Sequence, residues 1–155
     1  MTTADHASEK RRDAQRQRVY AWEDRVIAPH GGGLVAFAAA QPMVDALWAE
    51  LGLRFPPKVE PLPPQARRRM ADADRLRLRL PLECPPWVLL HELAHCLTST
   101  AEGFSDGHGA DFMGLYLQLL TRYLRLDRDT LLASLRAAGI AVNPEARPSF
   151  LDRPA

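Results

Sequence analysis

The chain has 155 residues, of which 46% are hydrophobic and 25% are charged, and its formal net charge is +1. This length and composition are typical of one globular domain with a modest core, so we predict a single domain over residues 1–155. The small net charge gives no electrostatic reason to expect a nucleic-acid partner, and no apolar run is long enough to predict a membrane-spanning helix.

The first part of the chain predicts two helices and one short strand. Residues 8–28 form a charged helical pattern, which the glycines at 31–33 end. Its apolar side consists of Val19, Val26 and either Trp22 or Tyr20. Residues 34–37 fit a short strand or a buried connection, and residues 42–53 predict a helix that begins at a proline. The apolar stripe of this helix consists of Met43, Leu47, Leu51 and either Ala46 or Glu50.

The middle of the chain predicts strands. Five prolines between residues 55 and 64 exclude a central strand there, although residues 58–60 fit a short edge strand. Residues 75–80 alternate arginine and leucine, which is the pattern of a half-buried strand. We expect residues 67–71 to pair with this strand around a turn at 72–74.

Arginines are concentrated in the same region, at positions 67–69, 75, 77 and 79. We interpret them first as the solvated face of a hairpin. Binding of nucleic acid or of an acidic substrate is the alternative interpretation.

Three further helices are predicted over residues 86–99, 108–125 and 129–138, the last beginning near Asp127 or Asp129 and followed by Gly139. Residues 143–155 contain three prolines and no periodicity, so we expect a tail that is loose or draped over the surface. The whole pattern predicts an α+β domain, in which a small twisted sheet packs against helices.

The predicted helix over residues 86–99 contains the motif His91-Glu92-Leu93-Ala94-His95, an H-E-x-x-H sequence. Residues four apart lie on one face of a helix, so His91 and His95 can present two imidazoles to one metal ion. Glu92 lies beside that face, where it can reach a water molecule at the metal rather than the metal itself. The alternative is a partly buried helix with two ordinary histidines.

A catalytic zinc site uses three protein ligands and leaves one position for water. The candidates for the third ligand are Glu102, Asp106, His108 and Asp111. We prefer His108, because imidazole suits zinc and because residues 99–107 look like a loop that returns the chain to the helix. Asp106 or Ser105 is the expected N-cap of the following helix, and Asp106 or Asp111 could orient a ligand imidazole.

The residues from His91 to His95, then His108-Gly109 and Phe112, resemble the SprT-like zinc metallopeptidases, over about thirty residues. Residue 101 is alanine where the metzincin pattern needs its histidine, which excludes that group. The resemblance implies a zincin-like fold in which one Zn²⁺ is bound by His91, His95 and His108, with Glu92 as the catalytic base. Residues 12–23 also resemble the first helix of a group of small bacterial putative metallohydrolases of no known substrate.

Only two cysteines, Cys84 and Cys96, occur, so the cysteine-rich zinc ribbon of many SprT-like proteins cannot form and their DNA-linked roles should not be carried over. Residues 1–18 are polar and lack an apolar segment for secretion, and with so few cysteines this favours a reducing, cytoplasmic compartment. We expect both cysteines to be packed core residues.

The sequence thus favours a zinc metallopeptidase that uses Glu92 to activate a zinc-bound water against an amide bond of a peptide or protein. The expected second electrophile is Tyr116, Tyr123 or a nearby arginine. The alternatives are a non-peptidase amidohydrolase and a zinc-stabilised regulatory domain without turnover. We expect a peptide to pair with the strand over residues 75–80.

Overall fold

A computed structural model describes residues 15–63 and 71–151, and it has an α+β architecture. The N-terminal half contains α2 (Arg16–Trp22), a π-helix η1 (Glu23–Ile27), a 3-10 helix η2 (Ala28–His30), β1 (Val35–Ala36), α3 (Phe37–Glu50), β2 (Lys58–Pro61), β3 (Asp72–Ala73) and β4 (Arg77–Leu80). The C-terminal half contains β5 (Glu83–Cys84), α4 (Pro86–Leu97), α5 (Ala110–Tyr123) and α6 (Arg128–Ala137).

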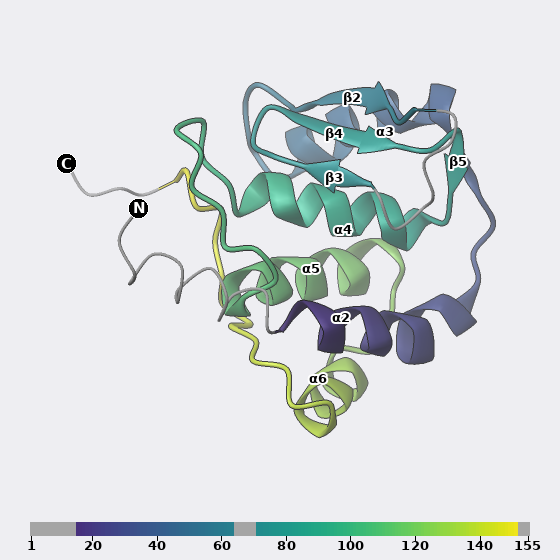
Figure 1. Cartoon of the computed structure of the whole chain (residues 1–155), viewed down its shortest axis with the longest axis vertical. Helices are drawn as coiled ribbons and strands as arrows, with labels where there is room; N and C mark the ends of the chain where they lie inside the picture. Colours follow the sequence, from purple (N-terminus) through teal and green to yellow (C-terminus); the bar gives the residue numbers. More distant parts are fainter. Residues whose placement is uncertain (1–14, 64–70, 152–155) are drawn as a thin grey trace.

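The elements are stacked in layers around α4 (Figure 1). The sheet of β2, β4 and β3 covers one side of α4, and α5 and α2 cover the other side, with α6 beyond them. Because both sides of α4 are covered, apolar residues are buried all around it. His91 and Glu92, two polar residues of this helix, are therefore buried, which is unusual for such residues unless they have a specific task.

The strand over residues 75–80 forms in part, as β4, but its neighbours differ from those predicted. The strand order is β2-β4-β3, so β4 is the central strand, parallel to β2 and antiparallel to β3. Our expectation that a peptide could pair with β4 is therefore wrong, because both of its edges are occupied. Leu78 and Leu80 are buried against α4, as the alternation predicted.

The predicted turn at residues 72–74 is also corrected. Asp72 and Ala73 are strand residues, and the chain turns after them, where the Asp74 carboxylate accepts hydrogen bonds from the backbone N–H groups of Leu76 and Arg77. Of the predicted partner strand, residues 67–70 lie outside the described residues. The edge strand predicted over residues 58–60 is confirmed as β2.

The helix predicted over residues 42–53 begins earlier and ends earlier, as α3. Three alanines follow Phe37, and their high helix propensity favours a helix that begins before Pro42. Pro42 therefore lies inside α3 rather than at its start. The buried face contains Ala40, Val44, Leu47 and Trp48, whereas Ala46 and Glu50 are exposed. The predicted strand over residues 34–37 is reduced to β1, which pairs with β5.

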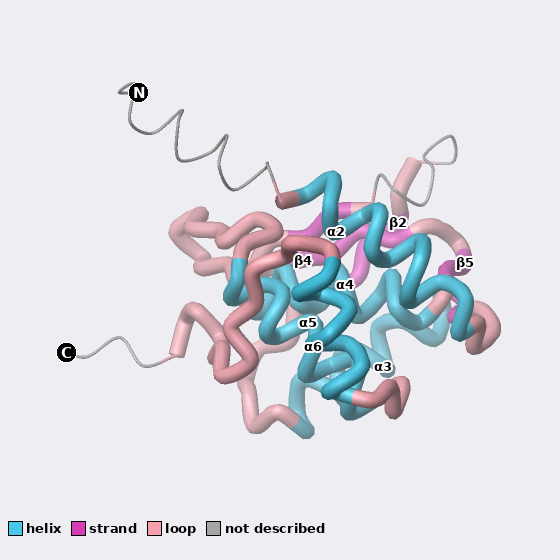
Figure 2. Tube along the Cα trace, turned by 90° about the horizontal axis from the view of Figure 1, so that it is seen from below, coloured by secondary structure: helices cyan, strands magenta, loops and turns pink. Residues whose placement is uncertain are grey.

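Of the segment predicted as a helix over residues 8–28, the part from Arg16 onward is helical, and residues 8–14 lie outside the described range. Val19 and Trp22 are fully buried, so Trp22 rather than Tyr20 belongs to its apolar side. Trp22 contacts α5 through the ring of Tyr116, and it contacts α6 through a hydrogen bond from its Nε1 to Ser134 Oγ. The end of α2 thus packs against both α5 and α6 (Figure 2).

At the other end of the chain, α6 begins as predicted, with the Asp127 carboxylate accepting from Thr130 N, and it is followed by Gly139 at φ 69°. Residues 143–151 have no helix or strand, but they are draped over α5 and α4 rather than loose. Asn143 N donates to Ala110 O, and Ser149 N donates to Leu97 O.

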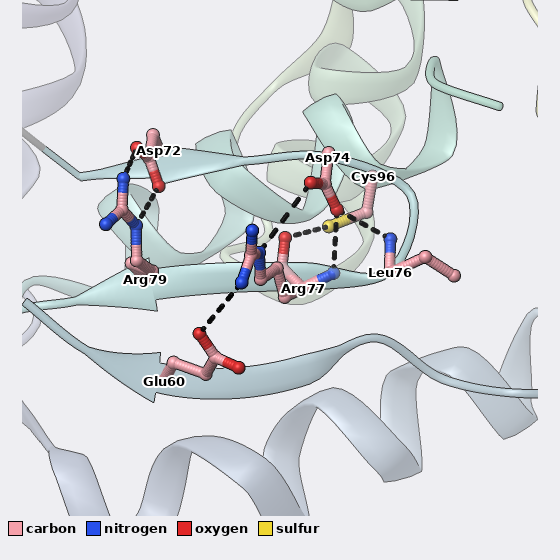
Figure 3. Close-up of polar contacts among 7 residues, drawn as sticks. All are labelled: Glu60, Asp72, Asp74, Leu76, Arg77, Arg79 and Cys96. Atoms are coloured by element: carbon pink, nitrogen blue, oxygen red, sulfur yellow. Dashed lines mark hydrogen bonds and ion pairs between the residues drawn. The ribbon is translucent and has the colours of Figure 1, made fainter. Parts of the chain in front are cut away.

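The arginine side of the sheet faces away from α4 (Figure 3). Arg77 lies 3.6 Å from Glu60 Oε2 and 3.8 Å from Asp74 Oδ2, and Arg79 is paired with Asp72. Arg75 instead stacks over the rings of Trp48 and Phe150. The described part of this face therefore alternates charges of both signs and is not a continuous positive surface.

Both cysteines are free and buried, and burial raises the pKa of the Cys96 thiol, as expected of packed residues. No helix in the described ranges combines the length and apolar character that crossing a bilayer requires.

Candidate metal centre

The structure brings His91, His95 and His108 together. Each offers one nitrogen, and these three nitrogen atoms lie within 4.8 Å of one another. The ring centroids are 5.0 Å apart for His91 and His95, 5.3 Å for His91 and His108, and 4.7 Å for His95 and His108. The group could bind a metal ion.

Local structure explains how the three imidazoles converge. His91 and His95 are one helical turn apart on α4, which Pro86 begins. After α4 the chain folds back, with Asp106 N donating to Thr98 O and Gly103 N to Thr100 O. This loop places His108, two residues before α5 begins, beside His95, the less buried of the two α4 histidines.

The start of α5 differs from the prediction that Asp106 or Ser105 is its N-cap. Gly109 occupies that position, and the Asp106 carboxylate accepts from Phe112 N at 3.0 Å. A Cβ atom on residue 109 would lie 2.6 Å from Asp106 Oδ2, so only glycine lets this carboxylate lie over the helix start. Asp106 thus fixes the chain immediately after His108.

Unpaired polar atoms are found at this cluster. Within residues 15–63 and 71–151, the buried side-chain atoms without a hydrogen-bond partner are Glu92 Oε2 and both ring nitrogens of His108. Leaving such groups unpaired inside a protein costs about 1–3 kcal/mol each. A metal ion would satisfy a nitrogen of His108, and a water molecule beside it would satisfy Glu92, so the residues present fit a bound cation.

The protonation of the metal-free site also suits a cation. Burial lowers the pKa of His95 well below its ordinary value and lowers the pKa of His108 to about 3, and the charge of His91 acts in the same direction. Both rings are therefore neutral at pH 7, which is the form that binds metal. Burial raises the pKa of Glu92 to about 7 in the absence of a cation.

A buried carboxylate that the sequence did not single out contacts this cluster. Glu23 Oε2 lies 2.7 Å from Nδ1 of His91, and it accepts a hydrogen bond of 2.7 Å from the hydroxyl of Tyr116. Burial alone lowers the pKa of His91, but the charge of Glu23 and this hydrogen bond raise it above the ordinary value. The only signal in the sequence is a charged residue four positions after Val19, on the apolar side of the first helix.

Aromatic rings form the walls of the site. Phe112 is stacked on His95 at 4.3 Å and lies 5.0 and 5.1 Å from the rings of His91 and His108. Tyr20, from α2, lies 5.4 Å from His108 and 6.1 Å from His91. The imidazoles are thereby restricted in the orientations they can adopt.

An open cavity of about 440 Å³ borders the cluster. Its walls come from α2, the residues around β3, α4 and the loop before His108, and they include Arg16, Tyr20, Asp72, Glu92, His95 and His108. Glu92 and two of the histidines are therefore accessible from one hollow beside the outer strand β3.

The other candidate residues have different roles. Glu102 is exposed beside a second cavity with Arg75 and Phe150, and Asp111 accepts from Asn143 Nδ2. Glu23 contacts a candidate ligand imidazole, that of His91, which is the role predicted for Asp106 or Asp111. The hydroxyl of Tyr116 is bound to Glu23 and that of Tyr123 to Glu50 on the surface, so neither tyrosine faces the cavity as the expected electrophile.

Comparison with known proteins adds no relative: no family model, no curated protein and no solved structure matches this chain.

Proposed function

We propose that this protein is a zinc-dependent metallopeptidase of the zincin type, as its resemblance to the SprT-like enzymes implies. The observation that carries the proposal is the cluster of His91, His95 and His108 with the unpaired Oε2 atom of Glu92 beside it. Zn²⁺ suits three neutral imidazoles. In the described residues, the group of side chains that could hold a metal ion consists of these three histidines, without a fourth ligand. A purely structural zinc site would use a fourth protein ligand and would not need Glu92.

A bound Zn²⁺ would supply a Lewis acid that polarises an amide carbonyl and acidifies a water molecule. Glu92 takes a proton from the attacking water and later delivers it to the leaving amine. Its carboxylate lies 3.9 Å from Nε2 of His91, close to the cluster but not in hydrogen-bond contact with that ring. Glu92 is only 4% exposed, although it lines the open cavity, so few water molecules can contact its carboxylate at once.

The cavity favours a peptide over a small amide. It is open, and it runs beside Asp72 and Ala73 of β3, the last strand of the sheet formed by the described residues. An extended peptide can add to such an edge through its backbone, which places an amide bond near Glu92. Arg16 and Tyr20 line the same cavity and are the candidates to stabilise the developing oxyanion.

The proposal is tested with Glu92→Gln, which keeps the size of the side chain and removes the base, and with Glu83→Gln in the exposed part of β5 as the matched control. Zinc content and hydrolysis of a mixed peptide library are measured for both. We expect Glu92→Gln to retain stoichiometric zinc while the rate falls about 100- to 10,000-fold, and Glu83→Gln to match the wild type.

Wild-type rates in Glu92→Gln would remove the proposed base. Wild-type protein that binds zinc but cleaves neither peptides nor small amides would instead favour a regulatory domain without turnover.

A further inference from the structure

Glu23 is a buried carboxylate that connects the first helix to α4 and α5. The side chains of Glu23 and His91 are only 4% and 7% exposed, and Oε2 of Glu23 receives both His91 Nδ1 and the Tyr116 hydroxyl. We propose that Glu23 is a positioning residue of the metal centre, which holds His91 so that its Nε2 atom faces the metal, and that Tyr116 fixes Glu23 in turn. This inference rests on the metal site of the proposed function, but not on the reaction.

The tautomer of His91 follows from this contact. A neutral imidazole carries one N–H, and a carboxylate accepts hydrogen bonds but cannot donate them when ionised. In the neutral form of His91, which is the form that binds a metal, the proton is therefore on Nδ1 and the lone pair is on Nε2. Nε2 lies 3.9 Å from Oε1 of Glu92, and Glu92 lines the same cavity as His95 and His108.

The burial of Glu23 supports the same role. A carboxylate inside an apolar helical layer is costly unless charge compensates it, and the two groups bound to its Oε2 atom are a phenol and an imidazole. A divalent cation on the far side of His91 would supply that charge through one imidazole. In the metal-free protein a protonated His91 can supply this charge instead, so burial of Glu23 is consistent with a loaded metal site.

The backbone around Glu23 is also specialised. The chain is π-helical from Glu23 to Ile27, a geometry that is rare and concentrated at functional sites. Trp22, just before this segment, and Ile27, its last residue, are buried, with 0% and 1% of their surfaces exposed, so the segment that carries Glu23 is packed into the core at both ends.

The molecule contains a matched pair for the experiment. Glu50 Oε2 accepts a hydrogen bond of 3.1 Å from the hydroxyl of Tyr123, which repeats the Glu23–Tyr116 contact on the exposed surface. Glu23→Gln and Tyr116→Phe are compared with Glu50→Gln and Tyr123→Phe. Glu23→Asp tests whether a shorter carboxylate partly rescues the site.

Two properties are measured: Zn²⁺ affinity, by competition with a chelator, and the visible spectrum of the Co²⁺-substituted protein. Urea unfolding of the metal-free forms establishes that each variant is folded. We expect Glu23→Gln to weaken zinc affinity about 10- to 100-fold and to shift the Co²⁺ bands. Tyr116→Phe, which keeps the His91 contact, should have a smaller effect in the same direction, and the Glu50 and Tyr123 variants should match the wild type.

Unchanged zinc affinity and an unchanged Co²⁺ spectrum in folded Glu23→Gln would overturn the inference and leave the proposed peptidase intact. A wild-type protein that binds zinc without hydrolysing any amide, and whose affinity falls in Glu23→Gln, would overturn the peptidase and support the inference. A wild type that binds no divalent metal would overturn both.

Discussion

The side-chain amide of Gln15 donates a hydrogen bond of 2.8 Å to the backbone carbonyl of His108. Gln15 also exchanges hydrogen bonds with the backbone of Ala141, donating to its carbonyl and accepting from its N–H. His108 lies outside any helix, so its backbone depends on such contacts. Gln15 and Glu23, which lie at the two ends of α2, thus contact two of the three candidate ligands, His108 and His91 respectively.

We predict that Gln15→Ala lowers both stability and metal affinity. Loss of its hydrogen bonds should reduce the free energy of unfolding by about 1–3 kcal/mol. If about 1 kcal/mol of this is felt at His108, zinc affinity falls about fivefold. Urea unfolding and chelator competition measure the two effects.

Gln118→Ala is the matched control, because the Gln118 amide also donates to two backbone carbonyls, those of Pro144 and Ala146. It should lose similar stability and keep its metal affinity. An equal loss of affinity in both variants would show that Gln15 acts only through general stability.

The metal-free protein should lose stability on acidification because of His108. Its folded pKa of about 3 lies below the ordinary 6.5, so between these values only the unfolded state binds the proton. The free energy of unfolding then falls by about 1.4 kcal/mol per pH unit below pH 6.5. His95 acts in the same direction, and Glu92, with its pKa raised to about 7, opposes them between about pH 4.5 and 7.

His91 has the reverse sign, since its raised pKa gives stability that is complete below pH 6.5 and is lost as pH rises. The difference between variants isolates His108. Between pH 6.5 and 4.5, metal-free wild type should lose about 2–3 kcal/mol more than metal-free His108→Asn. His30→Asn, at an exposed position of η2, should follow the wild type; equal pH profiles for all three proteins would contradict the assignment.

Gly114→Ala should release the C-terminal segment. A Cβ atom there would lie 1.7 Å from the carbonyl oxygen of Asn143 and 2.9 Å from Cβ of Ala146. The clash should cost about 1–3 kcal/mol beyond the helix propensity that alanine gains. Faster hydrogen exchange at the amides of Asn143 and Ser149 is the expected sign of the displaced segment. A variant more stable than the wild type would show that this contact is absent in solution.

Sequence reasoning located the part of the site that is encoded locally. His91, Glu92 and His95 lie within one and a half turns of a helix, so their spacing alone places them on adjoining faces. His108 could be selected because a short loop separates it from α4. The structure brings these three histidines together.

Glu23 and Gln15 could not be found in this way. Glu23 is 68 positions from His91, and Gln15 is 93 positions from His108, so no local period relates them. Similarly, the alternation in residues 75–80 predicted the burial of Leu78 and Leu80, although Leu76, which precedes β4, is exposed. It carries no information about which strands lie beside β4. Pairing of β4 with β2, a strand separated from it by residues outside the described range, is a property of the whole fold.

The distance in sequence between Glu23 and its two donors has a consequence for biosynthesis. As the chain leaves the ribosome, the carboxylate emerges long before His91 and Tyr116, and closing so large a loop is entropically costly. The proposed support of His91 by Glu23 can therefore form only after α4 and α5 have packed against the N-terminal helical segment. A nascent fragment that ends before Tyr116 should lack this network and bind metal more weakly. Tight metal binding would then require that folding is complete.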